Sequence, residues 1–273
     1  MVSVKFRAQK AQAATEYLVL VSVVLMIALV CIAILVWPTG ATKDTKQSQA
    51  DIKLGLGKIA YPELADGLAG YWKFDASPGV GVNSVVPGVD ASLINGTTFN
   101  ASGRSNGALQ FDGIDDYADS NRDYSWGVNG SFTISYWVYP YNPAGSRGIF
   151  GKPAPNWEWG TYINGNSPVF YYYNTTGSNY IINLQPTTLG TNAWTHIAIT
   201  YGGNQANFYK DGVLLQTQSN IGGTFKDNSA SVIFGRDYNV GGYFSGLLDD
   251  VHFYNRALSA DEIELLYEHP GYP

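Results

Sequence analysis

The sequence predicts a mainly β protein, in which one N-terminal hydrophobic helix precedes a two-sheet antiparallel β-sandwich with a short C-terminal helix. Composition gives the first indication: 31 glycines and 20 tyrosines accompany only 14 % charged residues. Such a balance is typical of short strands joined by tight turns. The second indication is the strand-like alternation that follows residue 68, and the third is an uncharged apolar run over residues 17–37.

Two segments of the C-terminal part alternate in the way that half-buried strands do. Residues 131–139 (SFTISYWVY) and 194–201 (WTHIAITY) are strongly alternating. Asp211 and Gly212 separate two further strand-like runs and predict a two-residue hairpin turn. Strands joined in this way require an antiparallel sheet. In the first segment the residues expected on one face are Phe132, Ile134, Tyr136 and Val138.

Residues 259–268 (SADEIELLYE) form the segment of this region with a helical pattern. Ser259 is placed as N-cap and Glu262 lies three residues later, which is the spacing of a capping box.

The apolar run 17–37 is long enough, at about 1.5 Å rise per residue, to cross a bilayer core of about 30 Å. Lys5, Arg7 and Lys10 precede it, so the rest of the chain is expected outside the cell. A cleaved secretory signal is the alternative, but the run exceeds the usual apolar length and ends in Trp37-Pro38, a poor cleavage site. Retention of the helix is therefore the prediction.

Residues 10–18 (KAQAATEYL) carry a carboxylate, Glu16, at the edge of the apolar run. The segment resembles the class III signal of archaeal, type IV pilin-like proteins, although Ala11 stands where that family prefers Gly. The resemblance implies that a prepilin-type peptidase cuts between Ala11 and Gln12. It also implies that Glu16 pairs with the new α-amino group of another pilin-like subunit in a filament. An ordinary signal anchor, with Glu16 among the headgroups, is the alternative.

The expected organisation is a leader at residues 1–11, a hydrophobic helix at 12–37, a stalk at 38–66 and the β domain at 67–273. Ile52, Leu56 and Ile59 have helical spacing within the stalk, and Tyr61-Pro62 is expected to end any helix there. A short solvated spacer fits the same residues.

The β domain resembles the laminin-G, concanavalin A-like jelly rolls. Its phrases occur in that family's order over about 200 residues, and the ordered set is far more specific than any one phrase. The resemblance implies two antiparallel sheets packed face to face, with the first and last strands adjacent. The phrases are GYWKFD (70–75), NGALQFDGIDDY (106–117), SFTISYWV (131–138), WTHIA (194–198), YKDG (209–212), FSGLLDDVHFY (244–254) and NRALS (255–259).

Relatives with this fold include glycosidases, whose retaining members need two carboxylates about 5–5.5 Å apart. No pair of acids with suitable strand spacing is present, and Glu158 stands alone among aromatic residues. A binding module is therefore favoured over an enzyme. Aromatic side chains of two predicted strands, residues 157–162 and 170–173, could stack on sugar rings, although half of these side chains would face the core. The candidate ligand-binding residues are Trp157, Trp159, Tyr162, Tyr171 and Tyr173.

Some domains of this superfamily hold a structural Ca²⁺ near the paired first and last strands. The matching acids are Asp75 and Asp249, with backbone carbonyls expected to complete the oxygen shell. A solvated turn carboxylate is the alternative. Four sequons suit an extracellular domain in a host that glycosylates asparagine; they begin at Asn95, Asn100, Asn129 and Asn174.

A formal net charge of −6 and the lack of a basic cluster argue against a nucleic-acid partner. The three histidines are far apart in sequence, and the single cysteine, Cys31, excludes a disulfide within one chain. We therefore expect a pilin-like subunit of a surface filament that displays a lectin-like domain for adhesion or carbohydrate contact. The alternatives are a solitary membrane-anchored lectin-like protein and an anchored carbohydrate-active enzyme.

Overall fold

The computed structural model describes residue 21 and residues 61–75, 82–83, 90–125, 130–142, 144–152, 158–175, 179–183, 187–219, 221, 225–237 and 241–272. The chain divides into two units, residues 1–53 and 54–273. All described residues except Val21 belong to the second unit, and the account below concerns that unit alone.

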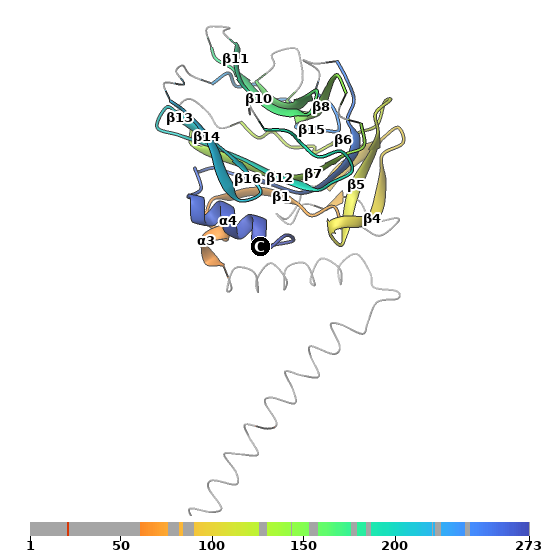
Figure 1. The fold of residues 1–273 in the computed structure, drawn as a ribbon, viewed down its shortest axis with the longest axis horizontal. Coiled ribbons are helices and arrows are strands. Elements are labelled where there is room, and N and C mark those ends of the chain that lie inside the picture. The colour runs from red at the N-terminus through yellow and green to blue at the C-terminus, as the bar shows by residue number, and fades with distance from the viewer. Residues whose placement is uncertain are drawn as a thin grey trace, which may run out of the picture. The chain divides into compact units, whose positions relative to one another are not determined.

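The domain consists of two antiparallel sheets, one above the other in Figure 1. In the first sheet β1 pairs with β16, so the first and last strands are adjacent, as the family resemblance implied. Its order is β14 (Val213–Ser219), β13 (Gln205–Lys210), β12 (Thr195–Gly202), β7 (Phe132–Pro140), β16 (Ser245–Tyr254), β5 (Gly107–Asp112) and β4 (Thr98–Ser105), with β1 (Leu68–Trp72) beside β16.

The second sheet faces the first across the core. Its order is β11 (Asn179–Asn183), β10 (Ser167–Tyr173), β9 (Trp159–Asn164), β8 (Ser146–Gly151), β15 (Ile233–Phe234), β6 (Tyr117–Asp119), β3 (Asp90–Ile94) and β2 (Val82–Asn83). The expectation of a two-sheet antiparallel sandwich is confirmed.

The main core lies between the sheets and is dominated by aromatic rings. Phe132, Ile134, Tyr136 and Val138 all belong to it, which confirms the face predicted for β7. Trp72 and Phe253, from the paired first and last strands, meet edge to face with centroids 5.5 Å apart. Such rings bury large apolar areas, so the domain can be stable without a disulfide.

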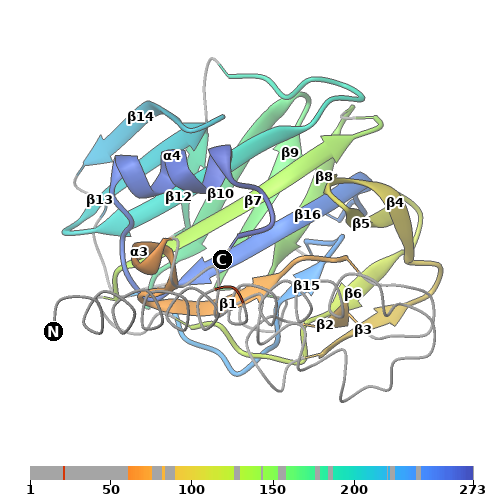
Figure 2. The same ribbon diagram turned by 90° about the horizontal axis from the view of Figure 1, so that it is seen from below.

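The outer face of the first sheet is covered as well. Helix α4 (Ala260–Glu268) lies across it in Figure 2, next to the short helix α3 (Pro62–Ala65). A second hydrophobic cluster, separate from the main core, forms here. It comprises Leu64, Ala198, Tyr209, Tyr254, Leu258, Ile263 and Leu266. This cover explains why even Thr133, Ser135 and Trp137 of β7 are buried, where sequence alternation suggested one solvated face.

Three local expectations can be compared with the structure. Ser259 Oγ accepts the amide of Glu262 while the Glu262 side chain accepts the amide of Ser259, which confirms the capping box. Asp211 and Gly212 have φ values of 49° and 78°, which confirms the tight hairpin turn. Tyr61 has non-helical dihedral angles (φ −136°, ψ 71°) and Pro62 begins α3, since proline is tolerated in a first helical turn; the stalk residues before them lie outside the described residues.

Among the described residues, no helix is long and apolar enough to cross a membrane. The hydrophobic run 17–37, apart from Val21, lies outside them, as do Ala11, Gln12 and Glu16. The pilin-like helix and its processing site therefore stay predictions.

Candidate functional site

The aromatic strands β9 and β10 place the predicted ligand-binding residues on two opposite faces. Trp159 belongs to the main core, whereas Tyr162 and Tyr171 form a separate cluster with Tyr173 packed against it. Trp159 and Tyr171 are both 0 % exposed. Trp157 lies outside the described residues.

Internal hydrogen bonds use the polar ends of these aromatic side chains. Trp159 Nε1 donates to the backbone oxygen of Tyr124 at 3.1 Å, and Tyr171 Oη donates to Asp237 Oδ1 at 2.7 Å. Burial raises the pKa of Tyr171 well above its usual value, and the Asp237 carboxylate adds to the effect. A sugar ring cannot reach a buried face. The prediction of an open stacking surface is therefore wrong for Trp159 and Tyr171, because Trp159 packs in the core between the sheets and neighbouring side chains bury Tyr171 on the opposite face.

Glu158, which stood alone in the sequence, belongs to a buried polar group. Lys152 Nζ lies 2.6 Å from Glu158 Oε2, 2.5 Å from Asp123 Oδ1 and 2.6 Å from the backbone oxygen of Asn228, and it also contacts Ser125 Oγ. Lys152 and Glu158 are each 1 % exposed. Burial raises the pKa of Glu158, and the Lys152 ammonium opposes that shift.

This buried group stabilises the fold and does not form an accessible catalytic site. The ammonium already holds both carboxylates, and a substrate cannot reach Glu158. The sequence could not reveal the group, because Asp123, Lys152 and Asn228 come from three separate segments. A lysine at the end of a buried strand was the one available signal.

Asp249 and Asp250 bind neighbouring backbone from inside β16. Asp249 Oδ2 accepts the amides of Arg104 and Ser105 at 2.7 and 3.0 Å. Asp250 accepts the hydroxyl of Tyr71 and the amide of Gly271, each at 2.7 Å. Burial is the main cause that raises the pKa of both carboxyls, and their mutual repulsion adds to the shift of Asp249.

Asp75 lies close enough to raise the pKa of both buried acids. Its own oxygens accept the amide of Gly107 at 3.0 Å and the side chain of Asn106 at 3.3 Å. Asp249 Oδ1 accepts the amide of Asp250 at 2.8 Å, so both oxygens of Asp249 already bind backbone amides, and the calcium expected beside Asp75 and Asp249 stays a prediction. No third carboxylate or histidine closes that site among the described residues, so backbone oxygens would have to complete it.

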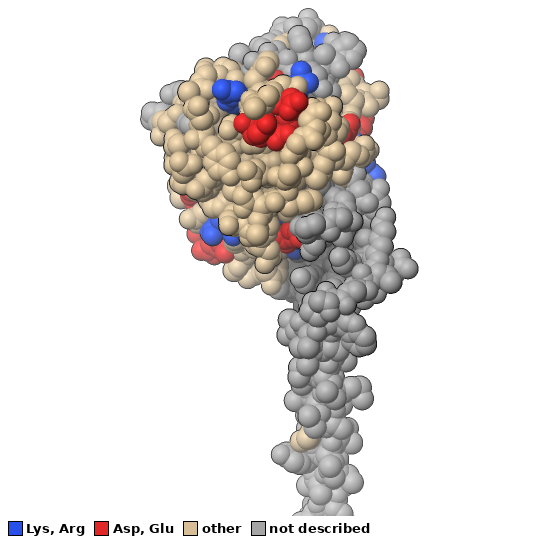
Figure 3. All heavy atoms as spheres, turned by 90° about the vertical axis from the view of Figure 1, so that its right-hand side faces the viewer, with Lys and Arg blue, Asp and Glu red and all other residues tan. Residues whose placement is uncertain are grey.

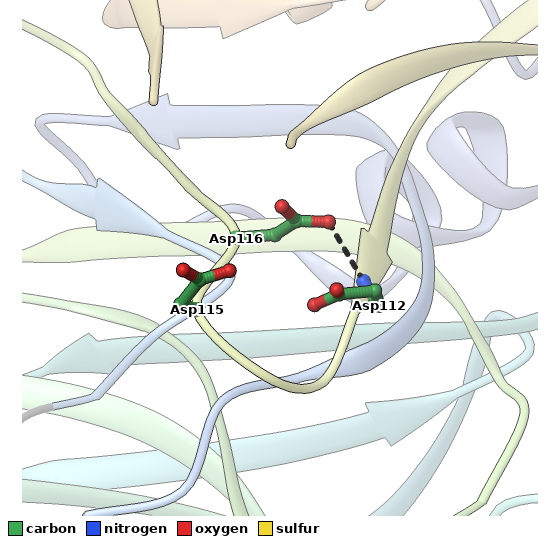
Figure 4. Close-up of side chains that lie close together, drawn as sticks. All are labelled: Asp112, Asp115 and Asp116. Carbon is green, nitrogen blue, oxygen red and sulfur yellow. Dashed lines mark hydrogen bonds between the residues drawn. The ribbon is translucent and has the colours of Figure 1, made fainter. Parts of the chain in front are cut away.

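A second set of acids lies on the loop between β5 and β6. Oxygens of Asp112, Asp115 and Asp116 lie within 4.8 Å of one another, a spacing that could hold a metal ion (Figure 4). Figure 3 shows a face of the domain with one larger group of acidic atoms, basic atoms beside it, and smaller acidic groups elsewhere on the same face. Asp116 is itself used by the fold, because it accepts the amides of Gly96 and Asp112 at 2.7 and 2.9 Å.

A serine–histidine contact that the sequence did not suggest lies under α4. Ser135 Oγ and His196 Nε2 are 2.7 Å apart, and each residue is 1 % exposed. Burial lowers the pKa of His196 to about 3, so its imidazole is neutral near pH 7. No described residue forms a hydrogen bond with His196 Nδ1, and burial closes the pair to substrate. It therefore lacks the acidic partner and the access that a catalytic triad needs.

The sequons differ in accessibility. Asn95 is exposed and Asn100 is half-buried, whereas Asn174 is 3 % exposed and Asn129 lies outside the described residues. A glycan needs an accessible amide nitrogen, so Asn95 and Asn100 stay the better candidates.

Comparison with known sequences decides the family. A sequence model of the concanavalin A-like lectin/glucanases superfamily matches residues 111–264, which is more than half of the chain. The chain belongs to this superfamily. Its jelly-roll resemblance, first inferred from ordered phrases, is thereby confirmed. A further match is the Adhesion G-protein coupled receptor V1 of Danio rerio, which is 27 % identical over an alignment of 163 residues; the match covers 52 % of this chain and 2 % of the receptor.

Solved structures show the same fold of this superfamily. The binding domain of Paraclostridial Mosquitocidal Protein 1 is 18 % identical with a TM-score of 0.62, over 75 % of this chain and 52 % of that one. The Botulinum neurotoxin serotype D ligand binding domain, solved in complex with N-acetylneuraminic acid, is 16 % identical with a TM-score of 0.62, over 77 % of this chain and 52 % of that one. This chain thus spans about half of each domain.

Proposed function

We propose that this member of the concanavalin A-like superfamily is a pilin-like subunit that displays its lectin-like domain on a surface filament and binds carbohydrate there. Membership of the superfamily carries the binding part of the proposal. The names of the similar structures describe binding domains, one of them with a bound sialic acid, which favours recognition over catalysis. The residues 10–18 motif carries the filament part.

The proposal assigns separate tasks to the two parts of the chain. Residues 12–37 hold the subunit in the membrane and then pack against other subunits, with Glu16 neutralising a neighbouring α-amino group. Removing one partner from such a desolvated pair costs about 3–5 kcal/mol in general, so Glu16→Gln should abolish assembly. The β domain faces outward and supplies adhesion.

The N-terminal sequence of native material sheared from the cell surface tests the filament part. A start at Gln12 in a pelletable fraction is expected. An intact Met1 found only in detergent-extracted membrane would favour the runner-up, a solitary single-pass anchored lectin-like protein.

Binding needs its own experiment. We expect the purified protein to bind a subset of immobilised glycans, sialylated glycans among those tested, with competition by the free sugar. Processing at Gln12 without glycan binding would leave a filament subunit whose domain has another ligand. Glycan binding with an intact Met1 would leave the anchored lectin.

A further inference from the structure

Exposed large apolar side chains of the described residues are concentrated on one strand. Val213, Leu214 and Leu215 are 62 %, 47 % and 46 % exposed, and they are consecutive on β14. The others of this kind, Leu93, Ile114 and Tyr272, are single residues in separate parts of the domain. Scattered exposed apolar residues are ordinary, but a contiguous group indicates an interaction surface.

The same strand forms one edge of the first sheet. β14 pairs with β13 on one side and ends the order of strands on the other. An edge strand presents unpaired backbone N–H and C=O groups, to which another strand can bind. Both ingredients of a strand-addition interface therefore coincide on β14.

Proteins usually protect such an edge with charge, proline or a very short strand. Strand β14 (VLLQTQS) has seven residues and contains neither a charged residue nor proline. Its one irregularity is a bulge: Phe208 pairs with Gln216 and Tyr209 with Leu214, which leaves Leu215 as the extra residue. The bulge explains why three successive apolar side chains are exposed, and regular pairing continues from Gln216 to Ser219.

We propose that β14 binds β14 of a second copy of this chain, antiparallel about a twofold axis, so that the first sheet continues across both subunits. The lack of charge on β14 is compatible with this partner. In an antiparallel contact about a twofold axis, residue i of one strand faces residue j of the other, and residues near the axis face their own copy, so a charge there would face a like charge. An uncharged strand avoids that repulsion, and the flanking aliphatic side chains gain burial. This contact is independent of the N-terminal helix and of the filament proposal.

Site-specific cross-linking in the full-length chain tests the interface. In a Cys31→Ser background, which removes the only native thiol, single cysteines replace Gln216, Thr217, Gln218 or Ser219 in turn. Mild oxidation of membranes that contain the protein is followed by a non-reducing gel. The matched control is Ile114→Cys, a site 73 % exposed but remote from β14 in sequence.

The expected result is a covalent dimer with a single maximum along β14, several-fold above the Ile114→Cys control, because only residues near the twofold axis meet their own copy. Adding Leu215→Lys should remove most of that product, whereas Ile114→Lys should leave it unchanged. Yields no higher than the control at all four sites would overturn the proposal. So would a dominant cross-linked product whose mass differs from that of two chains, since it would identify a different partner.

Discussion

Lys152 Nζ and Glu158 Oε2 lie 2.6 Å apart in a part of the domain that solvent does not reach. The lysine follows β8 and the glutamate precedes β9, so their contact closes the connection between two strands of the second sheet. Asp123, Ser125 and Asn228 add oxygens from two other segments. The group therefore ties three segments of the sandwich to one ammonium.

Lys152→Met should reduce the free energy of unfolding by about 3–5 kcal/mol, because it leaves the Glu158 carboxylate buried without its counter-ion. Urea denaturation of the full-length chain in detergent, followed by tryptophan fluorescence, measures the loss. Lys152→Met with Glu158→Leu should recover part of it, since neither charge then remains buried. The control is Lys210→Met, whose ammonium donates to the Thr188 backbone oxygen at an exposed position. Equal effects of the two single substitutions would contradict this account.

The sequence predicted those features that depend on local chemistry. The strand β7, the turn at Asp211 and Gly212, and the cap at Ser259 all depend on residues within a few positions of one another. The adjacency of β1 and β16 followed from the order of the family's phrases.

Burial of the outer faces could not be predicted in the same way. Alternation assigns one face of each strand to the core, but it does not show whether the other face is covered. The second sheet carries the Tyr162 and Tyr171 cluster on its outer side, and α4 covers His196 on the first sheet. An aromatic outer face therefore looked open for a ligand. The Lys152 group has the same origin, since its members are separated along the chain and meet only in the fold.

Ser259→Ala should reduce the free energy of unfolding by about 1 kcal/mol, the usual effect of removing an N-cap side chain. Ser259 Oγ accepts the Glu262 amide, and the first turn of α4 loses that acceptor in the variant. Chemical denaturation measures the change, with the exposed Ser229→Ala as control. No difference between the two variants would show that the Glu262 side chain alone sustains the cap.

Calcium should raise the melting temperature of the protein by binding beside Asp75 and Asp249. Saturation at about 100 times the dissociation constant stabilises a folded protein by about 2.7 kcal/mol, which corresponds to several degrees for a domain of this size. Asp75→Asn should abolish the rise, whereas Asp115→Asn, in the acidic loop of Figure 4, should retain it. If only Asp115→Asn abolished the increase in melting temperature, the calcium ion would be assigned to that loop instead. If calcium did not raise the melting temperature of the unsubstituted protein, the prediction of a calcium site would be wrong.

In the absence of calcium, stability should be greatest in mildly acidic solution. Burial raises the pKa values of Asp249 and Asp250 above those of the unfolded chain, so the folded state holds extra protons. Stability therefore decreases as the pH rises through their folded pKa values. Burial lowers the pKa values of His196 and His252 to about 3 and about 4. Those groups decrease stability as the pH falls below their ordinary value, about 6.5.

Melting temperatures measured from pH 4 to pH 9 in EDTA test the two opposing contributions. Between about pH 4 and 6.5 the contributions of the histidines and of the carboxyls to stability oppose each other. Above pH 6.5, of these four groups, only the carboxyls still change their protonation, so the melting temperature should decrease toward pH 9. Asp250→Asn, which resembles the protonated acid, removes the contribution that Asp250 makes between about pH 4 and its folded pKa of about 7. The melting temperature of this variant should therefore increase more steeply from pH 4 to 6.5 and decrease less above that range. A melting temperature that increased from pH 7 to pH 9 would mean that Asp249 and Asp250 are ionised in the fold, with a counter-charge beside them that the Tyr71 and Gly271 contacts do not supply.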